Sequence, residues 1–377
     1  MKPISLYIHI PFCKSKCYYC DFNSFSGLEN LIDEYFEALN KELTSYIDQL
    51  KGYTVKSVFF GGGTPSYVKA DYICNFLKAC KENLDFDSNA EITIEANPGT
   101  LDEGKLIKYH NAGINRLSIG LQACQNHLLN EIGRIHVLED FDRNLNLARK
   151  CGFNNISADL IFGLPGQSFN EWAETLDYVI EKKLEHISCY SLTIEEGTVL
   201  EKKISEGIIE PVDEELDRRM YHYAVEKLKQ NDYVHYEISN FAFKGRESRH
   251  NIAYWILQDY IGFGAGAHSY FQKRRFNNIY DVKNYISSLK GKLEIIENVC
   301  EIDKKTEISE YIILGLRMIN GINLKQLEEI YDFNIYKEHG ERIKELMERG
   351  LLDIRNNYMM LTSKGLDLAN QVMVEFI

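Results

Sequence analysis

The sequence has no apolar run close to the roughly eighteen residues that a membrane-spanning helix needs, and it has no excess of positive charge. The formal net charge of −13 opposes general electrostatic attraction to nucleic acid or to an anionic membrane. The first residues, MKPISLY, do not form a signal peptide. We therefore expect a soluble, cytoplasmic protein that binds no nucleic acid.

The nine cysteines do not form a disulfide framework, because their number is odd and most of them are scattered. Three lie close together: Cys13, Cys17 and Cys20 follow a strand-like run that ends at Ile10. Each iron of a [4Fe-4S] cluster needs an outer ligand, so three thiolates from one loop would leave one iron free for a small molecule. The other six cysteines are expected to be buried thiols.

A zinc site is the alternative for this loop. Structural zinc normally takes four protein ligands, and the nearby fourth candidate is His9, which alternates with Ile8 and Ile10 along the strand. The Cx3Cx2C spacing is not usual for zinc. It resembles the CxxxCxxC motif of the radical S-adenosylmethionine (SAM) enzymes. That resemblance implies SAM chelated by the free iron, an electron donor for the cluster, and release of a 5′-deoxyadenosyl radical.

After the cysteine loop, helical and strand-like patterns alternate. Residues 28–50 place Tyr35, Leu39 and Leu43 on one face of a helix. Six β/α units follow from strands that begin near residues 5, 55, 90, 115, 156 and 186. Such alternation implies a parallel sheet with right-handed crossovers. The predicted fold class is α/β, with six units that match the partial (βα)6 barrel of the radical SAM fold rather than a closed eight-stranded barrel.

From about residue 304 the pattern changes to helices, followed by two short strands about Asn356 and Asn357 and a last helix. This order predicts a mostly helical, winged-helix-like domain. DNA binding would need a basic third helix, whereas residues 336–349 carry four basic and four acidic side chains. We expect a lid or a partner-docking module instead. The predicted domains are a radical SAM core (1–235), a connecting region (236–303) and the winged-helix-like domain (304–377).

Polar residues and glycines lie where the predicted strands end, which is where a barrel binds its ligands. The strand VKSVFF leads into Gly62, Gly63 and Thr64, without the GK[ST] of a phosphate loop. Four polar residues lie at or just beyond later strand ends: Glu95, Gln122, Arg134 and Asp159. Carboxylates and an amide can bind ribose hydroxyls, and an arginine can pair with a carboxylate. Each of the four alone is more often an ordinary salt-bridge or loop residue.

Several strings closely resemble one family within the radical SAM enzymes: YIHIPFC, FGGGTPS, IEANP, RLSIGLQ, GRIH and DLIFGLPGQ. It is the family of oxygen-independent coproporphyrinogen III dehydrogenase (HemN) and its relative, the heme chaperone HemW. The likeness extends over nearly the whole chain. The resemblance implies that nine positions border SAM: Tyr7, Tyr19, Gly62, Gly63, Thr64, Glu95, Gln122, Arg134 and Asp159. Core packing is the alternative for the two tyrosines.

Two departures separate this chain from the dehydrogenase branch. Members with that activity carry a further cysteine two residues after the last cluster ligand, where this chain has Phe22. They also begin with a longer segment that closes over the reaction site, whereas only four residues precede Ser5. We expect a poorly covered site, which weighs against efficient radical decarboxylation of a porphyrinogen.

The chain also carries a motif that the dehydrogenase pattern lacks: residues 250–255 read HNIAYW. This string is similar to the HNxxYW signature of the heme chaperones, and the resemblance implies heme contacts at His250, Asn251, Tyr254 and Trp255. Imidazole is a common axial ligand of heme iron, and an indole and a phenol can pack against the macrocycle. A structural or solvated histidine is the alternative for His250. The glycines of IGFGAGAHSY predict a close-packed strand or turn.

The leading hypothesis is a heme chaperone that holds a [4Fe-4S] cluster, SAM and heme, and passes heme to an acceptor protein such as a respiratory one. Where such acceptors are membrane-bound, this hypothesis implies a peripheral association with the membrane. Whether the chain is an enzyme stays open. The alternative is oxygen-independent coproporphyrinogen III dehydrogenase, an activity that we expect to be absent or weak. A radical SAM methyltransferase acting on a tetrapyrrole or on RNA is the third hypothesis. The chain is expected to be a monomer or a cluster-dependent dimer.

Overall fold

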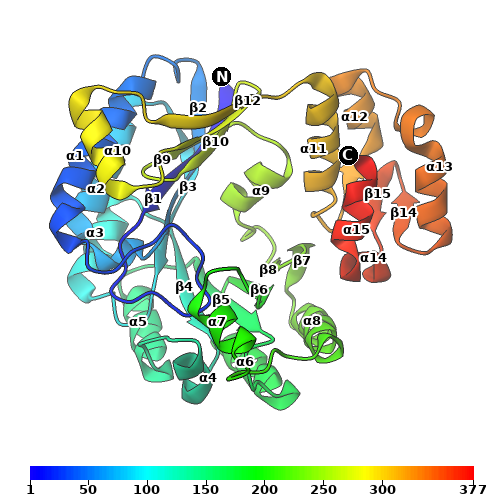
Figure 1. The fold of residues 1–377 in the computed structure, drawn as a ribbon, viewed down its shortest axis with the longest axis horizontal. Helices are drawn as coiled ribbons and strands as arrows, with labels where there is room; N and C mark the ends of the chain where they lie inside the picture. Colours follow the sequence, from blue (N-terminus) through cyan, green and yellow to red (C-terminus); the bar gives the residue numbers. More distant parts are fainter.

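The computed structural model describes all 377 residues, and its centre is a curved sheet with helices along the outer face (Figure 1). In the first half of the chain, parallel strands alternate with helices, and strands that follow one another in sequence are neighbours in the sheet. These elements are β1 (Lys2–Ile10), α1 (Ile32–Tyr46), β2 (Tyr53–Gly62), α2 (Ala70–Asn83), β3 (Phe86–Ala96), α3 (Glu103–Ala112), β4 (Arg116–Gln122), α4 (Asn126–Glu131), α5 (Leu138–Lys150), β5 (Ile156–Phe162), α6 (Phe169–Glu181) and β6 (His186–Ser191). The predicted fold class is confirmed.

The sequences of these elements explain the parallel arrangement. Every residue of β4, RLSIGLQ, is buried, which is typical of a strand covered on both faces. The helix α6 begins with a capping box between Ser168 and Glu171, so its first amides have partners. The helix α1 is shorter than the predicted helix 28–50, because residues 29–31 form a separate 3-10 turn.

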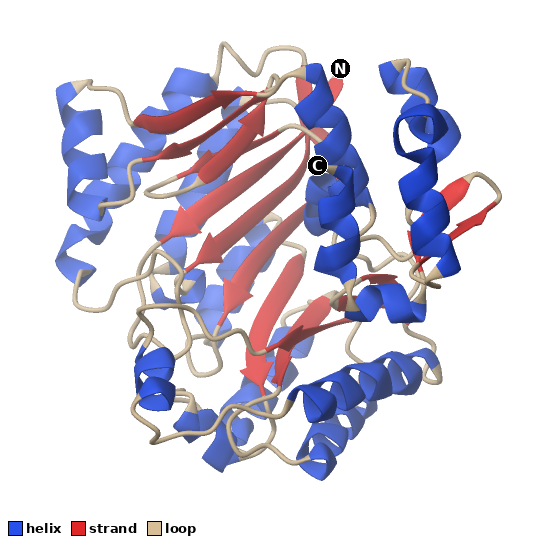
Figure 2. Ribbon diagram, turned by 45° about the vertical axis from the view of Figure 1, so that its right-hand side comes forward, coloured by secondary structure: helices blue, strands red, loops and turns tan.

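The sheet continues beyond the six parallel strands at both edges, so the barrel stays open (Figure 2). The strand β9 pairs in parallel with β1 and places Gly262 beside Tyr7. The next strands, β10 to β12, run antiparallel, and β8 and β7 extend the other edge next to β6. The elements of this part are α7 (Val199–Ser205), α8 (Glu214–Lys229), β7 (Val234–Glu237), β8 (Asn240–Ala242), α9 (Arg249–Trp255), β9 (Tyr260–Phe263), β10 (His268–Phe271), β11 (Arg274–Asn278), α10 (Val282–Gly291) and β12 (Ile296–Glu301).

The C-terminal residues form a module with its own hydrophobic core. The barrel core takes its buried residues from Ile4 to Ile295, and the second core takes them from Ile308 to Phe376. The predicted helices and hairpin are present, and both hairpin asparagines have positive φ, as a type I′ turn requires. The strand β13 was not predicted. The elements are α11 (Lys304–Gly315), β13 (Ile322–Asn323), α12 (Leu324–Tyr331), α13 (Ile335–Glu348), β14 (Leu352–Arg355), β15 (Tyr358–Leu361), α14 (Ser363–Asp367) and α15 (Ala369–Met373).

Backbone hydrogen bonds and ion pairs hold this module against the barrel. The contacts are Ile238 N to Arg317 O at 3.1 Å, Ile319 N to Tyr236 O at 3.1 Å, Lys273 with Glu307 at 2.8 Å, and Arg275 with Glu310 at 3.0 Å. The helix α11 therefore lies beside α9, on the open side of the barrel (Figure 1).

The prediction of six buried thiols outside the cysteine motif is wrong for four of them. Only Cys80 and Cys189 are buried, while Cys74, Cys124 and Cys151 are partly exposed and Cys300 is exposed on the edge strand β12. Cys74, Cys124 and Cys151 pack against the rim of the barrel core, so one side of each remains open to solvent. No helix of the structure has the length and apolar composition that crossing a bilayer requires.

The junction of β9 and β10 makes a stability prediction at Gly262. A Cβ there would lie 2.3 Å from the carbonyl oxygen of His268, so the two strands would have to separate. Gly262→Ala should lower the free energy of unfolding by about 1–3 kcal/mol, as overpacking usually does. The control is Gly291→Ala, whose Cβ meets only ordinary contacts of 3.6 Å or more and should be neutral or stabilising. Urea unfolding followed by tryptophan fluorescence measures both, and equal stabilities would contradict the prediction.

Candidate functional site

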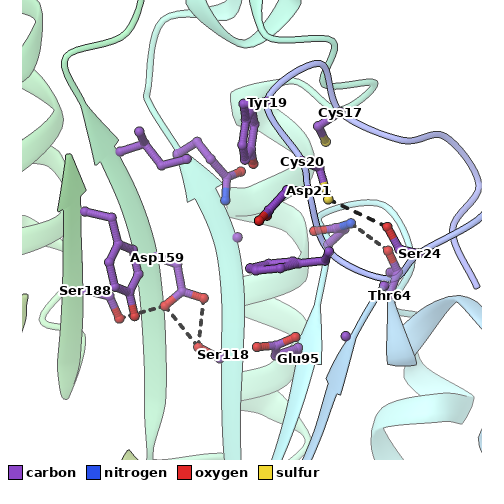
Figure 3. A pocket seen from close by; sticks show the side chains of 18 of the residues that line it. Cys17, Tyr19, Cys20, Asp21, Ser24, Thr64, Glu95, Ser118, Asp159 and Ser188 are labelled. Atoms are coloured by element: carbon purple, nitrogen blue, oxygen red, sulfur yellow. Dashed lines mark hydrogen bonds between the residues drawn. The ribbon is translucent and has the colours of Figure 1, made fainter. Parts of the chain in front are cut away.

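The three motif cysteines lie in the loop after β1 and face one cavity of about 520 Å³, called the first cavity. Figure 3 shows Cys17, Cys20, Ser24 and Thr64 in one corner of it. Each sulfur has a polar neighbour. Cys13 Sγ lies 3.4 Å from Thr64 Oγ1, and Cys20 Sγ lies 3.6 Å from Ser24 Oγ in the same loop. Cys17 Sγ accepts a hydrogen bond from Arg134 Nη1 at 3.4 Å. Such donors stabilise thiolates and orient metal ligands.

The alternative zinc ligand, His9, is held by other groups. Its Nδ1 lies 3.0 Å from Tyr7 Oη and its Nε2 lies 2.8 Å from the carbonyl oxygen of Asn23. Burial lowers the pKa of His9 to about 4. No group of three or more His, Cys, Asp or Glu side chains converges on a single-ion site. Three thiols around one open cavity fit a cluster with a free corner better than a closed zinc site.

The glycine turn after β2 packs directly on the cysteine loop. The amide of Gly63 donates to the carbonyl of Ile10 at 2.9 Å, and the amide of Thr64 donates to that of Phe12 at 3.0 Å. A Cβ on Gly63 would lie 2.9 Å from Cys13 Sγ, so a side chain here would displace the sulfur. Gly62 has φ +110°, a backbone conformation that suits glycine alone. The turn therefore brings backbone close to the cysteines.

Two carboxyl groups predicted to bind SAM lie on the inner face of the sheet (Figure 3). Asp159 on β5 accepts from Ser118 Oγ on β4 at 2.9 Å and from Ser188 Oγ on β6 at 2.7 Å. Burial raises the pKa of Asp159. Burial, and then the nearby charge of Asp159, raise the pKa of Glu95 to about 8. A ligand therefore meets one firmly held carboxyl group and one that exchanges a proton near neutral pH.

Gln122 and Arg134 line the same cavity as these carboxyl groups and the cysteines. Gln122 ends β4 with φ +62°, a conformation that non-glycine residues adopt mainly where the surroundings enforce it. Its Oε1 is buried and has no partner, so a bound ligand can satisfy it. Arg134 Nη2 donates to Asn97 Oδ1 at 2.8 Å and to the carbonyl of Gly120 at 2.9 Å. The guanidinium is thus fixed beside Cys17.

The first cavity brings together all the residues that the sequence assigned to the cluster and to SAM. Its walls include the three cysteines and all nine SAM positions: Tyr7, Tyr19, Gly62, Gly63, Thr64, Glu95, Gln122, Arg134 and Asp159. The orphan amide oxygen, the glycine turn and the three thiols that line this cavity fit a cluster-bound nucleoside.

Sequence reasoning missed Arg116, which begins β4 and lines the first cavity. Its side chain is only 2% exposed, and its Nε has no hydrogen-bond partner. The positive charge of Arg116 lowers the pKa values of Glu95 and Asp159, and so acts against the effect of burial. The sequence does contain a signal for this residue, because a charged side chain at the start of a buried strand is unusual. The prediction of ligand contacts, however, rested on residues at the carboxyl ends of strands. Ser118 and Ser188 were missed for the same reason.

The helix α9 carries the HNxxYW residues and separates the first cavity from a second. His250 is 1% exposed, and both ring nitrogens have partners: Nδ1 lies 2.9 Å from Ser57 Oγ, and Nε2 lies 2.8 Å from Tyr254 Oη. Burial, and then the charge of Arg116, lower the pKa of His250 to about 3. As it stands, this imidazole positions Tyr254 and has no free nitrogen for iron.

The second cavity, of about 610 Å³, lies between α9, the strands β9 and β10, and α11. Its walls are rich in aromatic side chains: Phe22, Tyr254, Trp255, Tyr260, Tyr270 and Tyr280. Asn251 lines the first cavity, Trp255 lines the second, and Tyr254 lines both. The Nε1 of Trp255 is buried without a partner, and the guanidinium of Arg317 lies 4.3 Å from the centre of the indole. The HNxxYW residues are therefore divided between the cavities.

The open barrel, the CxxxCxxC loop and the glycine turn define a radical SAM protein, and the family description Radical SAM superfamily matches residues 7–179. The HemN C-terminal domain matches residues 302–368. The heme chaperone HemW of Lactococcus lactis is 37% identical over 377 residues, 100% of this chain and 98% of that protein. HemW of Bacillus subtilis is 36% identical over 374 residues, 99% of each. The chain belongs to the HemW family.

Solved structures agree with this assignment. Coproporphyrinogen III oxidase (HemN) from Escherichia coli, described as a radical SAM enzyme, has a TM-score of 0.88 at 25% identity, over 100% of this chain and 90% of that one. The predicted resemblance to the HemN and HemW family is confirmed.

The raised pKa of Glu95 makes a pH-dependent prediction. The folded-state value of about 8 exceeds the ordinary value of 4.5, so the folded chain holds this proton more tightly than the unfolded chain. The resulting stabilisation is complete below the ordinary value and is lost as pH rises through the folded value. Glu95→Gln stays neutral and should lose less stability than the parent between about pH 5 and about pH 8.5.

Urea unfolding at several pH values tests this expectation. Glu37→Gln provides the control, since it makes the same substitution at a side chain that is exposed to solvent. Parallel pH profiles of the parent and Glu95→Gln would contradict it.

Proposed function

We propose that the protein is a heme chaperone, which holds a [4Fe-4S] cluster and SAM in the first cavity, binds heme at the second, and passes heme to an acceptor protein. The names of its full-length relatives support this function. The observation that carries it is the meeting of the two cavities. A cysteine-lined cavity and an aromatic cavity share walls at Tyr7, Glu95 and Tyr254.

In this proposal Cys13, Cys17 and Cys20 hold the cluster. When bound, the cluster and SAM supply one-electron reductive chemistry, for which an external electron donor is required. The glycine turn lets backbone approach SAM closely, because no Cβ stands in the way at Gly62 or Gly63. Glu95, Gln122 and Asp159 offer acceptors to ribose hydroxyls. Arg134 keeps a positive charge beside the cysteine thiolates.

The HNxxYW helix is the proposed heme contact, with His250, Asn251, Tyr254 and Trp255 forming one wall. Trp255 and Tyr254 present flat aromatic faces, which suit a macrocycle. The bonds of His250 to Ser57 and Tyr254 hold this wall in place. For His250 itself to bind iron, one of those two hydrogen bonds would have to break, to free a ring nitrogen.

The alternative function, coproporphyrinogen III dehydrogenase, rests on the likeness to HemN. Phe22 weighs against it, because this side chain stands where the dehydrogenase pattern has a cysteine. Phe22 is 63% exposed and borders both cavities. It offers apolar contact to a ligand but no thiol. The proposal therefore includes weak or absent porphyrinogen turnover.

Replacing any of the three motif cysteines by alanine should abolish the cluster. After anaerobic reconstitution with iron and sulfide, the parent should retain roughly four irons and four sulfides per chain, as a [4Fe-4S] cluster does. Each variant should fall to near zero. Cys300→Ala is the control, because Cys300 is exposed on an edge strand far from the motif in sequence, and it should reconstitute like the parent. Retention of the cluster in Cys17→Ala would remove this assignment.

Heme binding and porphyrinogen turnover separate the two functions. Hemin added to the reconstituted protein should bind near one equivalent and should then move to a heme-free globin offered as a neutral acceptor. Coproporphyrinogen III, SAM and a reductant should yield no vinyl product beyond the level seen with Cys17→Ala. Sustained formation of vinyl product would favour the dehydrogenase, and failure to bind hemin would refute the chaperone.

A further inference from the structure

Four histidines line the two cavities, and they differ in whether a ring nitrogen is free. Three of them have partners on both nitrogens: His9 with Tyr7 Oη and Asn23 O, His186 with Ser157 Oγ and Tyr236 Oη, and His250 with Ser57 Oγ and Tyr254 Oη. All three are buried. None can bind iron without losing a hydrogen bond inside the protein, which is costly for a buried polar group.

His268 is the fourth, and it is exposed. It begins β10, directly after the glycine turn of IGFGAGAHSY. Its Nε2 lies 2.9 Å from Tyr280 Oη, and its Nδ1 has no hydrogen-bond partner. When Nε2 donates its proton to Tyr280, the lone pair remains on Nδ1. Metal-binding histidines usually have this arrangement, with one nitrogen anchored and the other free.

The surroundings of His268 suit an aromatic macrocycle with acidic side chains. Tyr254, Tyr270 and Trp255 supply flat surfaces in the same cavity. Arg275 on β11 also lines it, and its guanidinium lies over the ring of Tyr270. Arg275 pairs with Glu310 at 3.0 Å but keeps further donors, because a guanidinium has five N–H groups. An arginine is a good partner for a propionate.

We propose that the second cavity holds iron porphyrin, that His268 Nδ1 is an axial ligand of its iron, and that Arg275 binds a propionate. This inference rests on the proposed heme chaperone function and specifies its ligand. In this inference His250 is not the iron ligand. Tyr254 and Trp255 contact the macrocycle, and His250 positions Tyr254.

The charge state of His268 agrees with this assignment. Partial burial, and then the charge of Arg275, lower the pKa of His268. The ring is therefore neutral at neutral pH, as a metal ligand must be. Tyr280, 46% exposed, is the positioning residue, because its hydroxyl fixes which nitrogen of His268 stays free.

Hemin titration of the full chain tests the assignment. The Soret band and the low-temperature electron paramagnetic resonance spectrum report the axial ligand. His268→Gly should weaken hemin binding at least about tenfold, since loss of even a residue behind a metal ligand costs that much. It should also lose the imidazole-type spectrum, and free imidazole should restore it. His250→Ala should keep that spectrum, and exposed His127→Ala should match the parent in full.

A second variant covers the case in which the glycine variant folds poorly. His268→Cys keeps a metal-binding side chain at the site and should give a thiolate-type spectrum. Tyr280→Phe should keep imidazole ligation with weaker binding. An unchanged spectrum in both His268 variants, or its loss in His250→Ala alone, would overturn the assignment but leave the chaperone function standing. If the parent itself bound no hemin, the proposed function would fail, and this inference with it.

Discussion

The packing of the glycine turn on the end of β1 is the contact on which both cavities depend. Two backbone hydrogen bonds tie Gly63 and Thr64 to the segment that enters the cysteine loop. Thr64 then reaches the sulfur of Cys13 through its hydroxyl, so the turn sets the position of one cluster ligand directly. Gly62, in the same turn, packs against the ring of His9, because a Cβ there would lie 2.6 Å from that ring, and His9 is hydrogen-bonded to Tyr7. The glycine turn therefore contacts residues that line both cavities.

The interior of the barrel contains buried charged and polar groups that do not contribute to an apolar core. Asp159 and Arg116 are desolvated next to Glu95, and Gln122 combines a left-handed backbone with an unpartnered oxygen. Each feature costs stability, because buried polar groups without partners lose hydration. All of these features lie at one cavity. Their location indicates that the groups are kept, despite their cost in folding stability, because they bind a ligand. The paired serines around Asp159 limit this cost, since two hydroxyls satisfy the carboxyl group.

The sequence predicted the order of the elements and the first cavity well. The strands appear as short apolar runs between amphipathic helices, and residues at their carboxyl ends must meet at one mouth. Arg116, Ser118 and Ser188 were missed because they lie within or at the start of strands, where a pattern search expects only core. The partners of His250 were also beyond reach. Ser57 is 193 residues away, and a single sequence carries no signal for such a contact.

The division of HNxxYW between two cavities follows from helix geometry. Residues three and four apart share a helix face, so the rings of His250 and Tyr254 meet edge to face, with their centres 5.0 Å apart. The next residue, Trp255, turns toward another surface. The hydroxyl of Tyr254 and the hydroxyl of Ser57 hold the two nitrogens of His250, and Ser57 lies on β2, the strand that ends in the glycine turn. The proposed heme wall and the proposed SAM contact are therefore attached to the same strand. A shift of β2 on SAM binding would change the bond between Ser57 and His250, and through it the position of Tyr254. If the protein has the proposed chaperone function, Ser57 and His250 form a short physical connection between the first cavity and the second.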